Sequence, residues 1–253
     1  MFGVKIMINL LLEWSMRKGV SVHMSPSEPV VPRPAATVIL IRPGERDSLQ
    51  VFMTRRPDSM RFLPGYCVFP GGALEQEDYL FPKEYLHEPE GINDSVEVAY
   101  YIAAARELFE EVGVLLYQGE RKDVDAHMWR AWRREVNSQP GAFASIFKTC
   151  GWKLDLSALT YFGHRVTPKT SRYRYNTRFF LAHLPKGQQP DPDPYEIDKG
   201  FWVTPQEALQ EAREQRLKMA SPTMASLRAL AEYRGGPYPV LQDRPQDQVY
   251  RSS

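Results

Sequence analysis

The stretch that decides the fold and the chemistry of this chain is Ala104–Leu116, AARELFEEVGVLL. Its carboxylates Glu107, Glu110 and Glu111 are spaced i, i+3 and i+4, so a helix would place all three on one face. The neighbouring positions are apolar, which indicates that the helix lies against a core, where unpaired charge is costly. No His or Cys accompanies the carboxylates, so the cation they suit is Mg²⁺ or Mn²⁺ rather than Zn²⁺. The alternative is a solvated acidic helix face that binds nothing.

A pair of glycines precedes this helix. A short predicted strand, 66–69, runs into Pro70, Gly71 and Gly72. Paired glycines let the backbone approach a phosphate or a metal closely, and the carbonyl of Gly72 can be a further ligand. Alone, the pair is an ordinary turn. Because Asp78 and then the carboxylate helix follow, we interpret the turn as part of the same site.

Together these residues resemble the Nudix box, which has the form G, five residues, E, seven residues, R-E-U-x-E-E-x-G-U, with U aliphatic. Gly72 is followed after five residues by Asp78, and Arg106–Val114 matches the second half of the box at every specified position. Asp78 stands where the general box has Glu. Residues 79–105 number 27 where the family has seven, so 27 − 7 gives 20 inserted residues. We place the insertion at about 79–98 and expect a surface excursion.

A narrower resemblance lies upstream of the box. Arg61, Gly65 and Phe69, each separated by three residues and followed by Pro-Gly-Gly, are similar to the motif of Nudix coenzyme A diphosphatases. The long insertion inside the box looks most like the peroxisomal-type branch. The resemblance implies an α+β fold, namely a Nudix-type α/β/α sandwich with a mixed sheet, an insertion and C-terminal helices.

The resemblance also implies an activity, which is divalent-metal-dependent hydrolysis of a nucleoside diphosphate linkage. Coenzyme A or acyl-coenzyme A would give phosphopantetheine, or its acyl form, and 3′,5′-adenosine bisphosphate. One alternative is a NADH, ADP-ribose or nucleotide-sugar pyrophosphatase of the same superfamily. A non-catalytic nucleotide-sensing Nudix module is an alternative of another class.

The site residues that follow from the resemblance fall into three groups. The catalytic candidates are Arg106, Glu107, Glu110 and Glu111, with Glu196 as a further loop carboxylate and Asp198 as the weaker choice for it. The metal candidates are Gly72, Glu107, Glu110 and Glu111, holding Mg²⁺ or Mn²⁺. The substrate-binding candidates are Arg55, Arg61, Gly65, Phe69, Gly71, Gly72 and Arg178.

Arginines crowd a second stretch, residues 164–180. Strand alternation would put Arg174, Asn176 and Arg178 on one face. A basic stripe of this kind could hold adenine and the 3′-phosphate of coenzyme A by stacking and charge. An exposed strand edge kept soluble by arginine is the alternative interpretation.

The overall composition narrows the class of protein. The chain has 253 residues, with 32 Lys+Arg, 31 Asp+Glu and a net charge of +1. This balance gives no support for a general nucleic-acid binder, and two cysteines cannot form a disulfide framework. We expect a small-molecule nucleotide partner, no nucleic acid and no membrane, and keep a homodimer as an option.

The order of predicted elements suggests one domain with extensions. We expect a flexible leader at 1–31, the Nudix domain at 32–235 and a loose tail at 236–253. The apolar run within 6–12 is too short to span a bilayer, and we expect a cytoplasmic protein. Strands are predicted at 35–41, 49–56, 66–69, 152–162, 174–184 and 201–203, and helices at 95–116, 123–137, 204–217 and 221–234.

Overall fold

The computed structural model describes residues 30–45, 48–87, 92–93, 95–120, 124–244 and 247. The chain divides into a unit that ends at Val30 and a unit from Val31 onward, and only the second is considered below. The predicted leader lies almost entirely outside the described residues.

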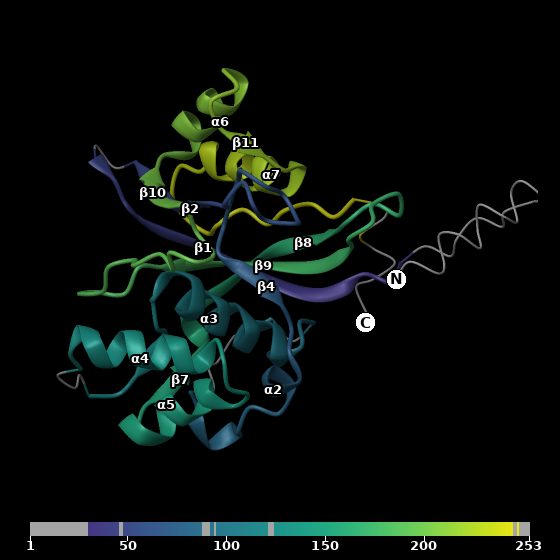
Figure 1. Ribbon diagram of the computed structural model, residues 1–253. Coiled ribbons are helices and arrows are strands. Elements are labelled where there is room, and N and C mark those ends of the chain that lie inside the picture. The colour runs from purple at the N-terminus through teal and green to yellow at the C-terminus, as the bar shows by residue number, and fades with distance from the viewer. Residues whose placement is uncertain are drawn as a thin grey trace, which may run out of the picture. The chain divides into compact units, whose positions relative to one another are not determined.

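A mixed sheet forms the centre of this unit (Figure 1). Over the described residues it has eight strands, in the order β11-β3-β2-β1-β9-β8, with β10 pairing to β2 and β4 pairing to β1. The strands are β1 (Arg33–Pro43), β2 (Leu49–Arg55), β3 (Tyr66–Val68), β4 (Gly71–Ala73), β8 (Leu159–Val166), β9 (Tyr175–His183), β10 (Lys199–Val203) and β11 (Lys218–Met219). β1 runs parallel to β9 and antiparallel to β2 and β4, so it lies in the interior of the sheet.

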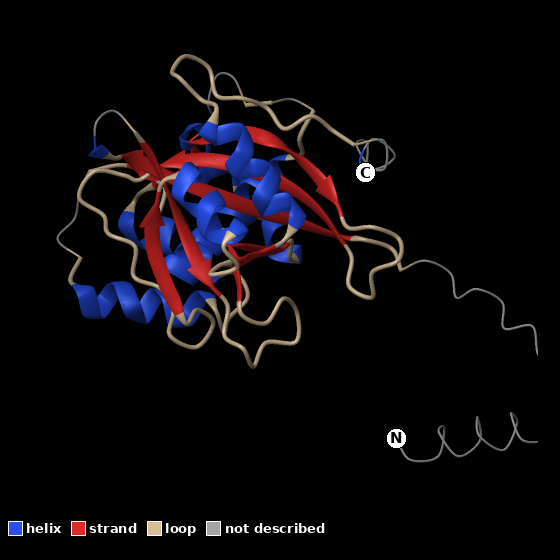
Figure 2. Cartoon of the chain, turned by 90° about the horizontal axis from the view of Figure 1, so that it is seen from above, coloured by secondary structure: helices blue, strands red, loops and turns tan. Residues whose placement is uncertain are grey.

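Helices cover both faces of this sheet (Figures 1 and 2). Successive residues of a strand point to opposite faces, and β1 contributes Val38 and Leu40 to one buried cluster and Ile39 and Ile41 to the other. The first cluster includes α3 (Val98–Val112), α4 (Ala126–Val136) and α5 (Ala142–Cys150), and the second includes α6 (Pro205–Arg213) and α7 (Ser221–Ala231). The predicted α/β/α sandwich with a mixed sheet is therefore confirmed.

The described part of the inserted segment is only partly the predicted surface excursion, because Phe81, Leu86 and Val96 are buried in the core while other residues such as Leu80 are exposed. It begins after α2 (Gln76–Tyr79) and includes η2 (Lys83–Tyr85) and β5 (Leu86–His87). Phe81 packs on Phe143 and Phe147 of α5, with ring centroids 6.0 Å and 5.8 Å away. β5 joins a second, three-stranded sheet with β6 (Tyr117–Gln118) and β7 (Lys153–Asp155). Apolar burial and strand pairing hold the described part of the insertion against α5.

Three local expectations also need correction. The predicted strand at 152–162 is two strands separated by η3 (Leu156–Ala158), because the Asp155 side chain accepts a hydrogen bond from the Ser157 amide and turns the chain. Helix α5 is not predicted from the sequence, since it is short and lies between Gly141 and Gly151. Helix α7 ends at Ala231, three residues before the predicted end at 234.

The tail after residue 236 is anchored rather than loose in its described part. Leu241 is buried, and its amide donates to the carbonyl of Phe162. Asp247 is fully buried and accepts a hydrogen bond from the Val166 amide. These contacts tie the tail to β8 of the sheet. Nowhere in the described ranges is there a helix with both the length and the apolarity needed to cross a bilayer.

Candidate functional site

Helix α3 carries the three carboxylates and ends at Val112, four residues before the predicted end at 116. Gly113 caps the helix in the left-handed conformation, with φ of 68°, which glycine adopts without steric cost. Leu108, Phe109 and Val112 are fully buried, so the helix cannot rotate without exposing apolar surface. Burial of this face sets the direction in which the carboxylates point.

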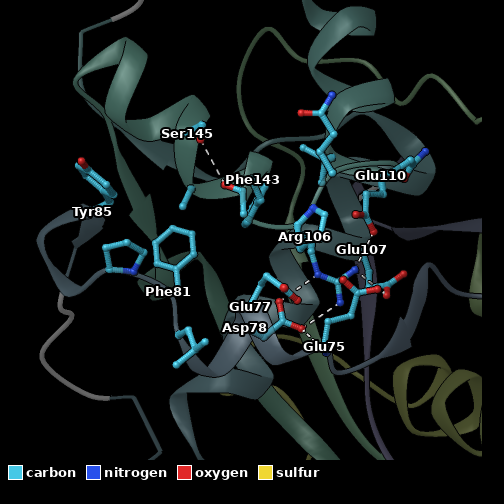
Figure 3. Close-up of a pocket in the computed structure, with 18 of the residues that line it drawn as sticks. Glu75, Glu77, Asp78, Phe81, Tyr85, Arg106, Glu107, Glu110, Phe143 and Ser145 are labelled. Carbon is cyan, nitrogen blue, oxygen red and sulfur yellow. Dashed lines mark hydrogen bonds and ion pairs between the residues drawn. The ribbon is translucent and has the colours of Figure 1, made fainter.

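Arg106 forms the hub of the site, meaning that its guanidinium group binds three acidic side chains (Figure 3). Its Nε donates to Asp78 Oδ1 at 2.9 Å and its Nη2 donates to Asp78 Oδ2 at 3.0 Å. Its Nη1 donates to Glu107 Oε1 at 3.0 Å and to Glu110 Oε2 at 2.7 Å, and Nη2 also reaches the carbonyl of Ala73. Such forked contacts fix both partners in one geometry. Arg106 thus pairs with Asp78 in spite of the 20 residues inserted between them.

Asp78 can reach Arg106 because it lies before the inserted residues, in the first turn of α2. Its Oδ2 accepts a hydrogen bond from the Glu75 amide at 2.8 Å, as part of a capping box. The carboxylate is only 2% exposed. The inserted residues follow this turn, so they do not disturb the contact between Asp78 and Arg106.

The glycine pair approaches the helix closely. The Gly71 amide donates to Glu111 Oε2 at 3.1 Å. A Cβ on Gly72 would lie 2.4–2.6 Å from the carboxylate atoms of Glu107, so the missing side chain is the space that this carboxylate occupies. The hydrogen bond from the Gly71 amide and the one from Arg106 to the Ala73 carbonyl join β4 to α3.

Burial makes the carboxylates costly to ionise. Desolvation is the largest cause that raises the pKa of Glu107 to about 7, against the opposing charge of Arg106. Desolvation also raises the pKa of Glu110 to about 8. The pKa of Glu111 lies well above its usual range, first through burial and then through the charges of Glu107 and Glu196. The cluster therefore favours protonation, or an added cation, at neutral pH.

A pH dependence of stability follows for the metal-free protein. The folded pKa values of Glu107 and Glu110 exceed the ordinary value of 4.5, so the folded state binds more protons than the unfolded state above that pH. The stabilising contribution is complete below about pH 4.5 and is lost as the pH rises through 7 and 8. We expect the free energy of unfolding, measured with urea in the presence of a chelator, to fall between pH 6 and 8.5, and Glu110→Gln to reduce that fall. An equal fall in Glu110→Gln would contradict the assignment.

Glu196 is brought to the carboxylate cluster by its loop. The amides of Asp191 and Asp193 donate to the carbonyls of Val112 and Glu111, both at 2.8 Å, and fasten the loop to the end of α3. Glu196 is exposed, yet its charge acts on Glu107 and Glu111. The weaker candidate, Asp198, pairs with Arg55 instead.

Arg133 of α4 is a site residue that the sequence analysis does not identify. Its Nη2 donates to the carbonyls of Glu110 and Glu111 at 2.9 Å and 3.1 Å, so its charge lies at the negative C-terminal end of α3. A signal is present in the sequence, because Arg133 interrupts the apolar stripe of Trp129, Trp132 and Val136 at helical spacing.

Among the predicted substrate-binding residues, Arg55 and Gly65 lie together, since a Cβ on Gly65 would be 3.4 Å from Arg55 Nη2. Arg55 is half-buried and pairs with Asp58 and Asp198, and Arg61 is exposed. Gly65 takes a left-handed conformation with φ of 70° beside Asp58, and Phe69 is buried in the core.

Of the two interpretations of the arginine-rich stretch, the exposed strand edge is wrong for Arg174, Asn176 and Arg178. β9 lies between β1 and β8, and Arg174, Asn176 and Arg178 are each less than 5% exposed. Arg178 donates to Asn176 Oδ1 at 2.7 Å and lies over the ring of Tyr100. The alternation itself is present, but it points these side chains into the protein rather than toward an entrance.

A cavity of about 810 Å³ opens beside the carboxylates (Figure 3). Arg106, Glu107, Glu110 and Glu196 line one part of it, and the insertion and the segment around the start of α5 line the rest. Among the described residues, no three Asp, Glu, His or Cys side chains converge as a ready cation site, because Arg106 and the Gly71 amide engage the carboxylates. The donors nonetheless suit a hard cation: they are oxygen ligands, their ionised forms repel one another, and Gly72 leaves room for Glu107.

Comparisons with known proteins agree with the fold described above. Residues 80–230 match the model of the NUDT19 Nudix domain. The crystal structure of a Nudix hydrolase from Alicyclobacillus acidocaldarius superposes with a TM-score of 0.72 at 31% identity, over 79% of this chain and 91% of that one.

Curated relatives are more distant in sequence. The acyl-coenzyme A diphosphatase NUDT19 of Xenopus laevis is 27% identical over 73% of this chain and 60% of its own length. The protein of the same name from Gallus gallus is 26% identical over 79% of this chain and 68% of its own length. This chain thus spans about two thirds of these relatives or less. The matches to the domain model and to the bacterial crystal structure show that the chain belongs to the Nudix hydrolase family.

Proposed function

We propose that this chain hydrolyses the diphosphate linkage of coenzyme A or an acyl-coenzyme A, giving phosphopantetheine, or its acyl form, and 3′,5′-adenosine bisphosphate. The observation that carries the proposal is the Arg106 hub, which holds Glu107 and Glu110 together beside the cavity. The choice of substrate is supported by the similarity to proteins named acyl-coenzyme A diphosphatase and by the upstream Arg61–Gly65–Phe69 motif.

Hydrolases of this family generally use divalent metal ions. In our proposal Mg²⁺ or Mn²⁺ is held by Glu107, Glu110, Glu111 and the carbonyl of Gly72. A bound ion of this type neutralises the charge of a diphosphate and makes a bound water more acidic. The high pKa values of the three carboxylates fit this use, since a cation relieves their mutual repulsion.

The protein's own side chains do the positioning. Asp78 keeps Arg106 in place, and Arg106 in turn holds Glu107 and Glu110 in one orientation. Glu196 is the exposed carboxylate at the cluster. We therefore assign it the role of general base: one of its carboxylate oxygens accepts the proton of the attacking water. Water attack on one phosphorus then breaks the bridging P–O bond, and the leaving phosphate departs with the bridging oxygen.

A substrate screen tests the proposal. The purified chain is incubated with Mg²⁺ and, separately, with coenzyme A, an acyl-coenzyme A, NADH and ADP-ribose, and products are separated by chromatography. We expect the two coenzyme A substrates to be cleaved most efficiently. Efficient cleavage of NADH or ADP-ribose without cleavage of coenzyme A would overturn the substrate assignment, and no cleavage of any of them would favour a nucleotide sensor.

The two glycines of β4 provide a separate prediction. In Gly72→Ala the added methyl group displaces the Glu107 carboxylate, so we expect Mn²⁺ affinity and turnover to fall while stability is retained, because the side chain can move. In Gly71→Ala the methyl group meets the Ala36 carbonyl oxygen at 2.3 Å, and we expect a loss of about 1–3 kcal/mol in the free energy of unfolding. Calorimetric Mn²⁺ titration and urea unfolding measure the two effects. Equal stability losses in both variants would contradict this difference.

A further inference from the structure

The cavity beside Arg106 has two chemically different parts (Figure 3). One part is the carboxylate cluster of the proposed reaction. The other is a mainly apolar wall with hydroxyl and amide groups, made by the insertion and by the turn into α5, and Glu84 and Lys148 are its charged members. Its uncharged members are Leu80, Phe81, Pro82, Tyr85, Asn137, Ser138, Gln139, Pro140, Phe143, Ala144 and Ser145.

The wall is a built feature of the fold. Phe81 is buried against Phe143 and Phe147 of α5, and β5 pairs with β7 on the other side of η2. These contacts hold Leu80 and Tyr85 at the cavity, with Leu80 68% exposed. Exposed apolar surface in a concave site is a common mark of ligand binding.

Charge decides which part of a nucleotide this cavity can receive. Its lining has seven acidic side chains, namely Glu75, Glu77, Asp78, Glu84, Glu107, Glu110 and Glu196, against the two basic side chains Arg106 and Lys148. Arg106 is already paired with Asp78, Glu107 and Glu110. Away from Arg106 and the carboxylates proposed for the cation, the lining still has Glu75, Glu77 and Glu84 against Lys148, so a further phosphate, such as the 3′-phosphate on a ribose, is disfavoured in this part of the cavity.

Coenzyme A has one phosphorylated arm and one uncharged arm. Its adenosine end carries the 3′-phosphate, whereas its pantetheine arm is an uncharged chain with two amides and, when acylated, an apolar tail. Resting on the function proposed above, we infer that the wall receives the pantetheine arm and its acyl chain, with the adenosine bisphosphate outside this part of the cavity. The insertion then acts as a specificity element, because it supplies Leu80, Pro82 and Tyr85.

Binding of the two reaction products tests the two arms separately. 4′-Phosphopantetheine carries only the pantetheine arm and 3′,5′-adenosine bisphosphate only the adenosine arm, and each has a terminal phosphate that can bind at the same catalytic centre. Ala144 is a half-buried lining residue of α5, so Ala144→Trp fills the wall side of the cavity. By titration calorimetry with Mg²⁺, we expect Ala144→Trp to weaken binding of 4′-phosphopantetheine by roughly tenfold or more. Binding of 3′,5′-adenosine bisphosphate is expected to stay unchanged.

A second pair of variants keeps the test independent of core packing. Leu80 is 68% exposed and lines the cavity, while its neighbour Tyr79 is 48% exposed and is not part of the lining. We expect Leu80→Glu to lower kcat/KM for a long-chain acyl-coenzyme A relative to coenzyme A by roughly tenfold. The matched Tyr79→Glu is expected to leave that ratio unchanged.

The outcomes separate this inference from the proposed function. If the unmodified protein cleaves coenzyme A but Ala144→Trp weakens only the adenosine product, or both products equally, the placement of the arms is overturned. Equal acyl-chain ratios in Leu80→Glu and Tyr79→Glu would overturn the role of the insertion. A protein that cleaves no coenzyme A overturns the proposed function, and this inference with it.

Discussion

Glu111→Gln is expected to lower kcat by about 10³-fold while the protein remains folded. Glutamine keeps an oxygen that can accept the hydrogen bond from the Gly71 amide, but it removes the negative charge proposed for the divalent cation. Because burial and the charges of Glu107 and Glu196 make ionisation of Glu111 costly, the metal-free variant should be at least as stable as the unmodified protein at pH 8. Steady-state kinetics with Mg²⁺ and urea unfolding measure the two effects.

An acidic residue that lines the cavity but lies away from α3 serves as the control. Glu84 lines the cavity and is exposed on η2, so Glu84→Gln removes one charge without touching α3. We expect its kcat to remain close to that of the unmodified protein. Full activity in Glu111→Gln would exclude Glu111 from the cation site. A large loss of stability in the same variant would mean that its charge supports the fold rather than the reaction.

Arg106→Met is expected to lower the free energy of unfolding by about 3–5 kcal/mol. The substitution leaves Asp78, which is 2% exposed, without the two hydrogen bonds that compensate its charge. The charges of Glu107 and Glu110 would also lose their shared donor. Urea unfolding at pH 8 measures the change.

The partner of the buried ion pair supplies the decisive control. In the double variant Asp78→Leu/Arg106→Met no charge remains unpaired at the Asp78 position, so we expect part of the lost stability to return. Arg216 is an exposed arginine that pairs with Glu211 and Glu214, and Arg216→Met should leave the unfolding midpoint unchanged. Strictly additive losses in the double variant would show that Asp78 and Arg106 do not stabilise each other.

Much of the carboxylate helix can be predicted from sequence because its geometry is local. The spacing of Glu107, Glu110 and Glu111 determines a shared face, and Gly113 determines the end of the helix, whatever lies elsewhere in the chain. The same is true of the capping box at Thr204 and Glu207, which starts α6. The layers of the sandwich also follow from the resemblance to the Nudix box.

Residues whose surroundings come from distant parts of the chain are less predictable. Arginines at 174 and 178 fit an exposed stripe as well as a buried one, and only the position of β9 between β1 and β8 decides for burial. Arg133 likewise acquires its role from the carbonyls at the end of a different helix. The charge of a side chain and its spacing from its neighbours can be read from the sequence, but its exposure depends on which elements cover it.

By itself, then, the sequence determined which residues are candidates for the chemistry, because three carboxylates at helical spacing and a glycine pair need no distant partner to be recognised. Only the tertiary structure decided how they are used. It closed the contact between Asp78 and Arg106 across the insertion, brought Glu196 to the cluster, and turned the insertion from a loop into a cavity wall. The reason is that these arrangements depend on burial and pairing between segments far apart in the chain, for which local spacing carries no signal.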